Sequence, residues 1–138
     1  MLAVAAVCAL TGCSIGPLGP ADARTVSLAE LATLTKVTFP TGTTVEDSTY
    51  LGFQDWHVEA KVRMPRHGVD AFFADSGWGR PVPGLRSVFM NGSGPTPGER
   101  IVGADQTKNS GYQGVYRKIL CDVTDPVTAT CYLVAFTT

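Results

Sequence analysis

A stretch of alternating apolar and polar residues, Gln54 to Met64, constrains the fold of this 138-residue chain more than any other feature. Its apolar positions are Trp56, Val58, Ala60, Val62 and Met64, and its polar positions are Asp55, His57, Glu59, Lys61 and Arg63. Because successive side chains of a strand point to opposite faces, this two-residue period predicts a β-strand with one face in the core and one in water. The same apolar residues on a helix would be scattered around its circumference.

The residues after this strand predict a short helix. Pro65 ends the strand, and Val69, Phe72 and Phe73 then recur at helical spacing. We expect a helix from Arg66 to about Asp75, with Gly77 as its left-handed stop. Its two phenylalanines are expected to cover the apolar face of the strand.

The residues before this strand predict weaker elements. Ser27 and Glu30 have the spacing of a capping box, which predicts one or two helical turns. Strand-forming residues then occupy 35–39 and 43–51. A turn over 52–55 would join the second of these segments to the alternating strand as a hairpin.

The C-terminal residues predict a second hairpin. Its strands are expected over 114–123 and 130–136, and Asp125 with Pro126 supplies the turn. A hairpin centred on Pro126 places Cys121 opposite Cys131, Leu120 opposite Tyr132, and Lys118 opposite Val134. A further short strand is predicted at 100–104.

These elements together predict an α+β domain. We expect an antiparallel sheet of four to six strands in β-β-α-β-β order, with one helix packed on one face. Charged residues make up only 17% of the chain, and it contains 15 glycines and 9 prolines, which is typical of a loop-rich domain with much β-structure. A chain of this length is expected to form one domain.

The first residues resemble an export signal. Met1 to Leu10 is apolar and uncharged, the right size for the core of a signal peptide. It runs into Leu10-Thr11-Gly12-Cys13, which resembles the bacterial lipoprotein signal. The resemblance implies that residues 1–12 are removed and that Cys13 carries a lipid. Residues 13–26, rich in Gly and Pro, then read as a flexible tether before a domain at 27–138.

The number of cysteines also agrees with export from the cytoplasm. Once Cys8 is removed with the signal and Cys13 carries the lipid, Cys121 and Cys131 remain as an even pair, as an exported domain should have. We expect them to form a disulfide across the C-terminal hairpin. A metal site on these two cysteines would lack further ligands, because both histidines lie far upstream.

One polar cluster could carry chemistry. Asp55, His57 and Glu59 share the wet face of the alternating strand, where two carboxylates beside a histidine could bind a divalent ion or tune a general base. The competing interpretation is a solvated strand face that Lys61 and Arg63 continue. We assign no catalytic residue, no metal and no cofactor from the sequence.

A second candidate site is aromatic. Trp78 and Tyr112 lie in predicted loops, where aromatic side chains often anchor a binding partner. Trp78 begins a long loop that extends to Gly98, with a brief strand predicted at 86–90. Core packing is the alternative role for such aromatic residues.

The whole chain resembles the small actinobacterial lipoproteins of unknown function, with the lipoprotein signal, the short tether and a strand carrying Trp56, Ala60, Val62 and Pro65. The resemblance implies an extracytoplasmic location at the cell membrane. We expect a binding module for a protein or cell-envelope ligand. The alternatives are a small hydrolase or metal-dependent enzyme centred on His57 with Asp55 or Glu59, and a structural envelope lipoprotein. We expect no nucleic-acid partner, since the chain has 11 basic and 12 acidic residues and no basic run.

Overall fold

The structure is a computed structural model that describes residues 23–52, 54–85 and 100–138. The expected signal peptide, Cys13 and the strand predicted at 86–90 lie outside the described residues.

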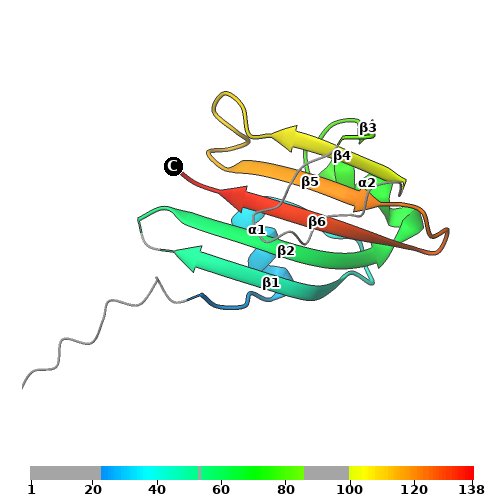
Figure 1. Cartoon of the computed structure of the whole chain (residues 1–138), viewed down its shortest axis with the longest axis horizontal. Coiled ribbons are helices and arrows are strands. Elements are labelled where there is room, and N and C mark those ends of the chain that lie inside the picture. The colour runs from blue at the N-terminus through cyan, green and yellow to red at the C-terminus, as the bar shows by residue number, and fades with distance from the viewer. Residues whose placement is uncertain (1–22, 53, 86–99) are drawn as a thin grey trace, which may run out of the picture.

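Six strands form one antiparallel sheet in the order β1-β2-β6-β5-β4-β3 (Figure 1). The strands are β1 (Thr44–Gly52), β2 (Trp56–Pro65), β3 (Val82–Pro83), β4 (Ile101–Gln106), β5 (Tyr116–Asp122) and β6 (Thr128–Phe136). The helices are α1 (Leu28–Thr35), the 3₁₀ turn η1 (Arg66–Gly68) and α2 (Val69–Asp75). The predicted α+β class is therefore confirmed.

The order of elements differs from the predicted β-β-α-β-β. A second helix, α1, precedes the sheet, and the two-residue strand β3 joins its edge. The hydroxyl of Ser27 caps α1 by accepting a hydrogen bond from the Glu30 N–H. The strand predicted at 35–39 is wrong, because α1 continues through Thr35 and ends at Lys36, which has a left-handed φ of 56°.

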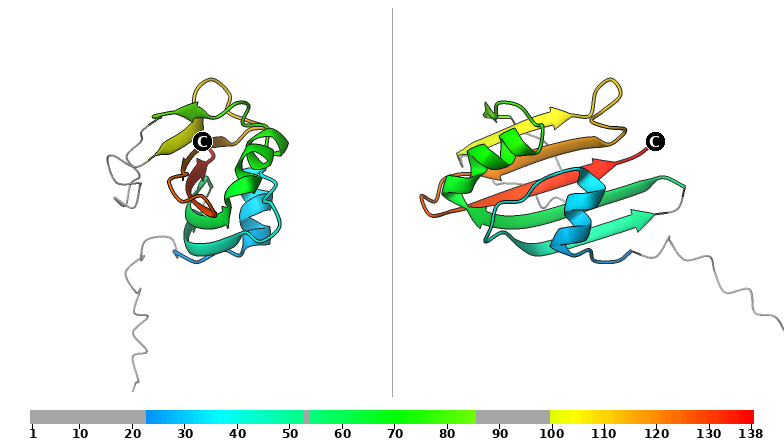
Figure 2. Two further views of the ribbon diagram at one scale, coloured as in Figure 1. Left: turned by 90° about the vertical axis from the view of Figure 1, so that its right-hand side faces the viewer. Right: turned by 180° about the vertical axis from the view of Figure 1, so that it is seen from behind.

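Both helices lie on the same face of the sheet (Figure 2). The apolar side of β2 faces them, and Val58, Val62 and Met64 are buried there in the same core cluster as Phe72 and Phe73. The prediction from alternation and helical spacing is confirmed at this layer. The main core is the space between the sheet and the two helices.

The C-terminal hairpin has the predicted register. Cys121 pairs with Cys131, Leu120 with Tyr132, and Lys118 with Val134. The two cysteines form the expected disulfide, and both are fully buried on the helix side of the sheet. The hairpin is thus closed by a covalent bond just before its turn.

Among the described residues, Arg117 is the one large polar residue at the centre of this core. It lies on β5 with 0% of its surface exposed. Its guanidinium donates hydrogen bonds to the carbonyls of Thr35, Lys36 and Ser76 and to the side-chain oxygen of Gln106. Because these acceptors belong to the ends of α1 and α2 and to β4, Arg117 ties both helices to the sheet.

Candidate functional site

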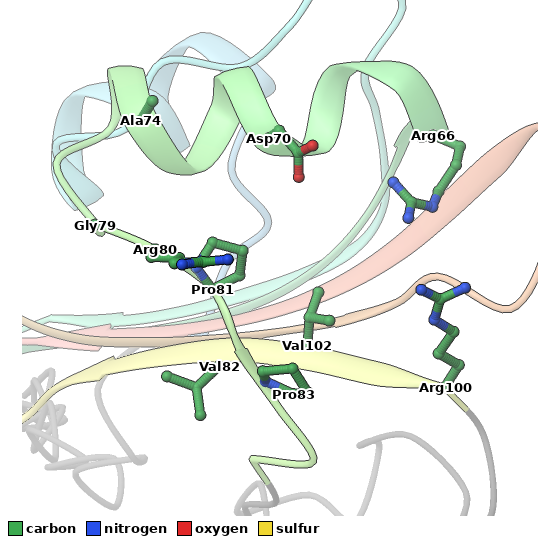
Figure 3. A pocket seen from close by; sticks show the side chains of 10 residues that line it. All are labelled: Arg66, Asp70, Ala74, Gly79, Arg80, Pro81, Val82, Pro83, Arg100 and Val102. Atoms are coloured by element: carbon green, nitrogen blue, oxygen red, sulfur yellow. The ribbon is translucent and has the colours of Figure 1, made fainter.

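A cleft opens between α2 and the β3–β4 edge of the sheet (Figure 3). Its volume is about 950 Å³, and small-molecule sites typically occupy about 300–1,000 Å³. We call it the arginine cleft and define it by the residues that line it: Arg66, Asp70, Ala74, Gly79, Arg80, Pro81, Val82, Pro83, Arg100 and Val102.

The lining of the arginine cleft is cationic although the whole chain has a net charge of −1. Three guanidinium groups, those of Arg66, Arg80 and Arg100, stand against the single carboxylate of Asp70. Within the described residues, none of these three arginines forms an ion pair. The cleft therefore offers three cationic groups to a ligand.

Two arginines elsewhere on the surface, Arg24 and Arg63, do form ion pairs. On the opposite face of the sheet, Arg63 and Lys61 contact Glu46 at 2.5 and 3.2 Å. Arg24 pairs with Glu30. These pairs neutralise charge at the surface, whereas no ion pair within the described residues neutralises the three arginines of the cleft.

The floor of the cleft is apolar. Pro81 and Pro83 form one side and Val102 on β4 the other, and Pro83 pairs with Val102 in the sheet. Val82 pairs with Gly103, and its side chain, which is 52% exposed, points away from α2 (Figure 3). A ligand with an anionic group and an apolar body would match both the walls and the floor.

The turn between β5 and β6 fixes two of the arginines. The N–H of Arg66 donates to the carbonyl of Val127 at 2.9 Å. The carbonyl of Arg100 accepts from the N–H of Val123 at 2.9 Å, and its N–H donates to the Thr124 hydroxyl at 3.0 Å. Both backbones are therefore attached to one short turn, which sets the distance between them.

Asp125 stiffens this turn. Its carboxylate accepts hydrogen bonds from the N–H groups of Val127 and Thr128 at 2.7 and 2.9 Å. These bonds favour the ionised form and lower the pKa of Asp125 below its usual value. The disulfide between Cys121 and Cys131 closes the strands that lead into the turn.

Arg117 supports the wall that carries Arg80. Its guanidinium lies 4.1 Å from the centre of the Trp78 ring and 3.7 Å from that of the Tyr112 ring. Gly77 permits this arrangement, because it has a φ of 68° and a Cβ there would meet the Tyr112 ring at 2.5–2.7 Å. Burial lowers the pKa of Arg117 to about 10, so its side chain stays charged at neutral pH.

The structure places Trp78 and Tyr112 around Arg117. Trp78 is only 6% exposed, and Tyr112 is half-buried. Both rings contact the buried guanidinium of Arg117, and neither Trp78 nor Tyr112 lines the arginine cleft.

The cluster of Asp55, His57 and Glu59 is brought together only in part. His57 and Glu59 lie on the face of β2 opposite the helices, 3.7 Å apart, and Glu59 is 7% exposed although its position was expected to be wet. Neighbouring strands β1 and β6 crowd this central position. Asp55 lies in the exposed bend before β2 and makes no hydrogen bond or ion pair with His57.

The described residues contain neither a metal-binding cluster nor a membrane-spanning helix. No group of three His, Cys, Asp or Glu side chains in residues 23–52, 54–85 and 100–138 is placed to hold a metal ion. In the same ranges, no helix has the length and apolar character needed to cross a membrane.

Comparison of the chain with protein-family models, with curated proteins and with solved structures finds no match. The site therefore has to be judged on its own geometry. The sequence analysis missed the three arginines of the cleft, because they are far apart along the chain and form no run. The signals that were present are modest: Arg66 directly follows a proline, and Arg80 directly precedes one.

Proposed function

We propose that this protein is a binding module anchored by a lipid at Cys13 on the outer side of the cell membrane, and that the arginine cleft binds its ligand. The ligand carries an anionic group and an apolar body. The location rests on the resemblance of Leu10 to Cys13 to a lipoprotein signal, and actinobacterial origin rests on the wider resemblance of the chain.

The observation that carries the binding proposal is the charge of the cleft. Three guanidinium groups line a space of about 950 Å³ without an ion pair among the described residues. Such groups bind carboxylates and phosphates through paired, charge-assisted hydrogen bonds. An apolar floor adds affinity for the part of the ligand that is not charged.

The test uses three small probes with the same ring and different anionic groups: benzoate, benzenesulfonate and phenyl phosphate. We expect at least one of them to bind the full chain in isothermal titration calorimetry. Affinity should fall about tenfold or more in the double variant Arg66→Gln, Arg100→Gln, because each lost guanidinium removes charge-assisted hydrogen bonds.

The matched control is Arg63→Gln, which removes the same charge from the opposite face of the sheet. It should leave probe affinity unchanged. Absence of binding by all three probes, or equal losses in the cleft and control variants, would refute the binding proposal.

A further inference from the structure

We infer that the anionic group bound by the arginine cleft is a phosphomonoester, held as a dianion between Arg66 and Arg100. This inference rests on the proposed function and adds the chemical class of the ligand.

The side chains of Arg66 and Arg100 are arranged so that one group can contact both. Arg66 starts from η1 on the helix side of the cleft, and Arg100 starts just before β4 on the sheet side (Figure 3). Their guanidinium groups point into the same end of the cleft from opposite walls. Two guanidiniums offer two positive charges and two planar sets of N–H donors to one group.

The backbones of Arg66 and Arg100 are held in place before any ligand binds. Arg66 and Arg100 are both attached through their backbones to residues 123–127, as the hydrogen bonds to Val123, Thr124 and Val127 show. A carboxylate has two oxygens and one charge, which one arginine satisfies. A terminal phosphate has three acceptor oxygens and about −1.5 to −2 charges at pH 7, so it can use two arginines at once.

The remainder of the cleft would accommodate the rest of the ligand. Arg66 and Arg100 occupy one end of the cleft, Arg80 lies toward the other end, and Asp70 faces the space between them (Figure 3). Asp70 would repel a second anionic group close to it and would accept a hydrogen bond from a hydroxyl or ammonium group. The body of the phosphomonoester would lie over Val102 and Pro83.

The experiment compares the same three probes at pH 8 and pH 5. Phenyl phosphate is mainly a dianion at pH 8 and mainly a monoanion at pH 5, because the second pKa of a phosphomonoester is about 6. Benzenesulfonate has three oxygens but one charge at both values, so it corrects for any change in charge of the protein between them. The titratable groups beside the two arginines are Asp70 in the cleft lining and His67, which neighbours Arg66 in the sequence.

We expect phenyl phosphate to bind about tenfold or more tightly than benzenesulfonate and benzoate at pH 8, and the advantage to shrink at pH 5. The advantage should also disappear in Arg66→Gln and in Arg100→Gln singly, while Arg63→Gln keeps it. Arg80→Gln should weaken all three probes by similar factors.

The outcomes separate this inference from the proposed function. Equal binding of all three probes that is lost in the double cleft variant would overturn the phosphomonoester and leave the anion-binding cleft standing. Binding of none of the probes, or binding unaffected by the cleft variants, would overturn both.

A second arm identifies the source of the phosphomonoester, which is either a lipid headgroup or a soluble molecule. The full chain with Cys13→Ala is sedimented with vesicles that contain phosphatidic acid or, as a diester control of similar surface charge, phosphatidylglycerol. Selective sedimentation with phosphatidic acid, reversed by phenyl phosphate, supports a lipid. Binding of phenyl phosphate without selective sedimentation supports a soluble ester.

Discussion

Arg117 shows how a single side chain can organise this small core. Its acceptors are three backbone carbonyls and one amide oxygen, and its guanidinium also contacts the rings of Trp78 and Tyr112. The carbonyls of Thr35 and Lys36 lie at the C-terminal end of α1, where the helix dipole is negative and favours a cation. The buried charge of Arg117 is therefore stabilised by carbonyl dipoles and aromatic rings instead of by a carboxylate.

Arg117→Met should lower the free energy of unfolding by about 3 kcal/mol or more, because several buried acceptors would lose their donor together. Arg117→Lys should be intermediate, since an ammonium keeps the charge but cannot reach all four acceptors. Urea unfolding of both variants measures the effect. A loss of less than about 1 kcal/mol in Arg117→Met would mean that the acceptors find other donors.

Among the elements, the disulfide-bonded β5–β6 hairpin is the one that positions the arginines of the cleft. Its disulfide, its Asp125-stabilised turn and its hydrogen bonds to Arg66 and Arg100 lie in sequence along one hairpin. The hairpin thus acts as the support on which the two arginines are mounted.

Thr124→Val should weaken phenyl phosphate binding several-fold, because the N–H of Arg100 loses the hydroxyl that accepts from it at 3.0 Å. Thr124→Ser retains that hydroxyl and should retain the affinity. Since Thr124 is exposed, the unfolding free energy of both variants should change by less than about 1 kcal/mol. Equal affinity of the Val and Ser variants would contradict the positioning role.

Asp125→Asn should make stability less dependent on acidic pH. The folded-state pKa of Asp125 is lowered, so its contribution is fully present above the unfolded value near 3.8 and is lost as pH falls through the lower folded value. The wild type should therefore exceed the variant in urea midpoint at pH 7, and the difference should narrow below about pH 4. Asp75→Asn, on the exposed end of α2, is the control. A constant difference at all pH values would exclude this explanation.

The sequence predicted the elements whose pattern is local, and it failed where tertiary contacts decide. The two-residue period of β2 and the hairpin register of Cys121 and Cys131 could be predicted because residues close together in the sequence define them. The burial of Trp78 and Glu59 could not be predicted, because it depends on strands and loops far away in the chain. The convergence of Arg66 and Arg100 likewise depends on the turn at 123–127.

At the scale of the whole molecule, the sheet has two different faces. The helices cover one face and enclose the main core, and the arginine cleft lies where α2 leaves the β3–β4 edge open (Figure 2, Figure 3). The opposite face carries the pairs of Glu46 with Lys61 and Arg63. Binding at one edge and anchoring through the N-terminal segment would be compatible with a module at a membrane surface.

Anchoring is tested by expressing the full chain and its Cys13→Ala variant in a bacterium that processes lipoproteins. The wild type should be recovered in the membrane fraction, and the variant should not, because it lacks the cysteine of the lipoprotein signal that would carry the lipid. Recovery of both forms in the same fraction would contradict a lipid anchor at Cys13.

Mapping the phenyl phosphate site by NMR tests directly whether the arginine cleft binds an anionic ligand. Amide resonances of the ¹⁵N-labelled chain are followed during titration. Shifts concentrated at Arg66, Val82, Arg100, Val102 and Thr124 would support binding in the arginine cleft. An absence of shifts, or shifts centred on the opposite face at His57, Tyr116 and Phe136, would contradict it.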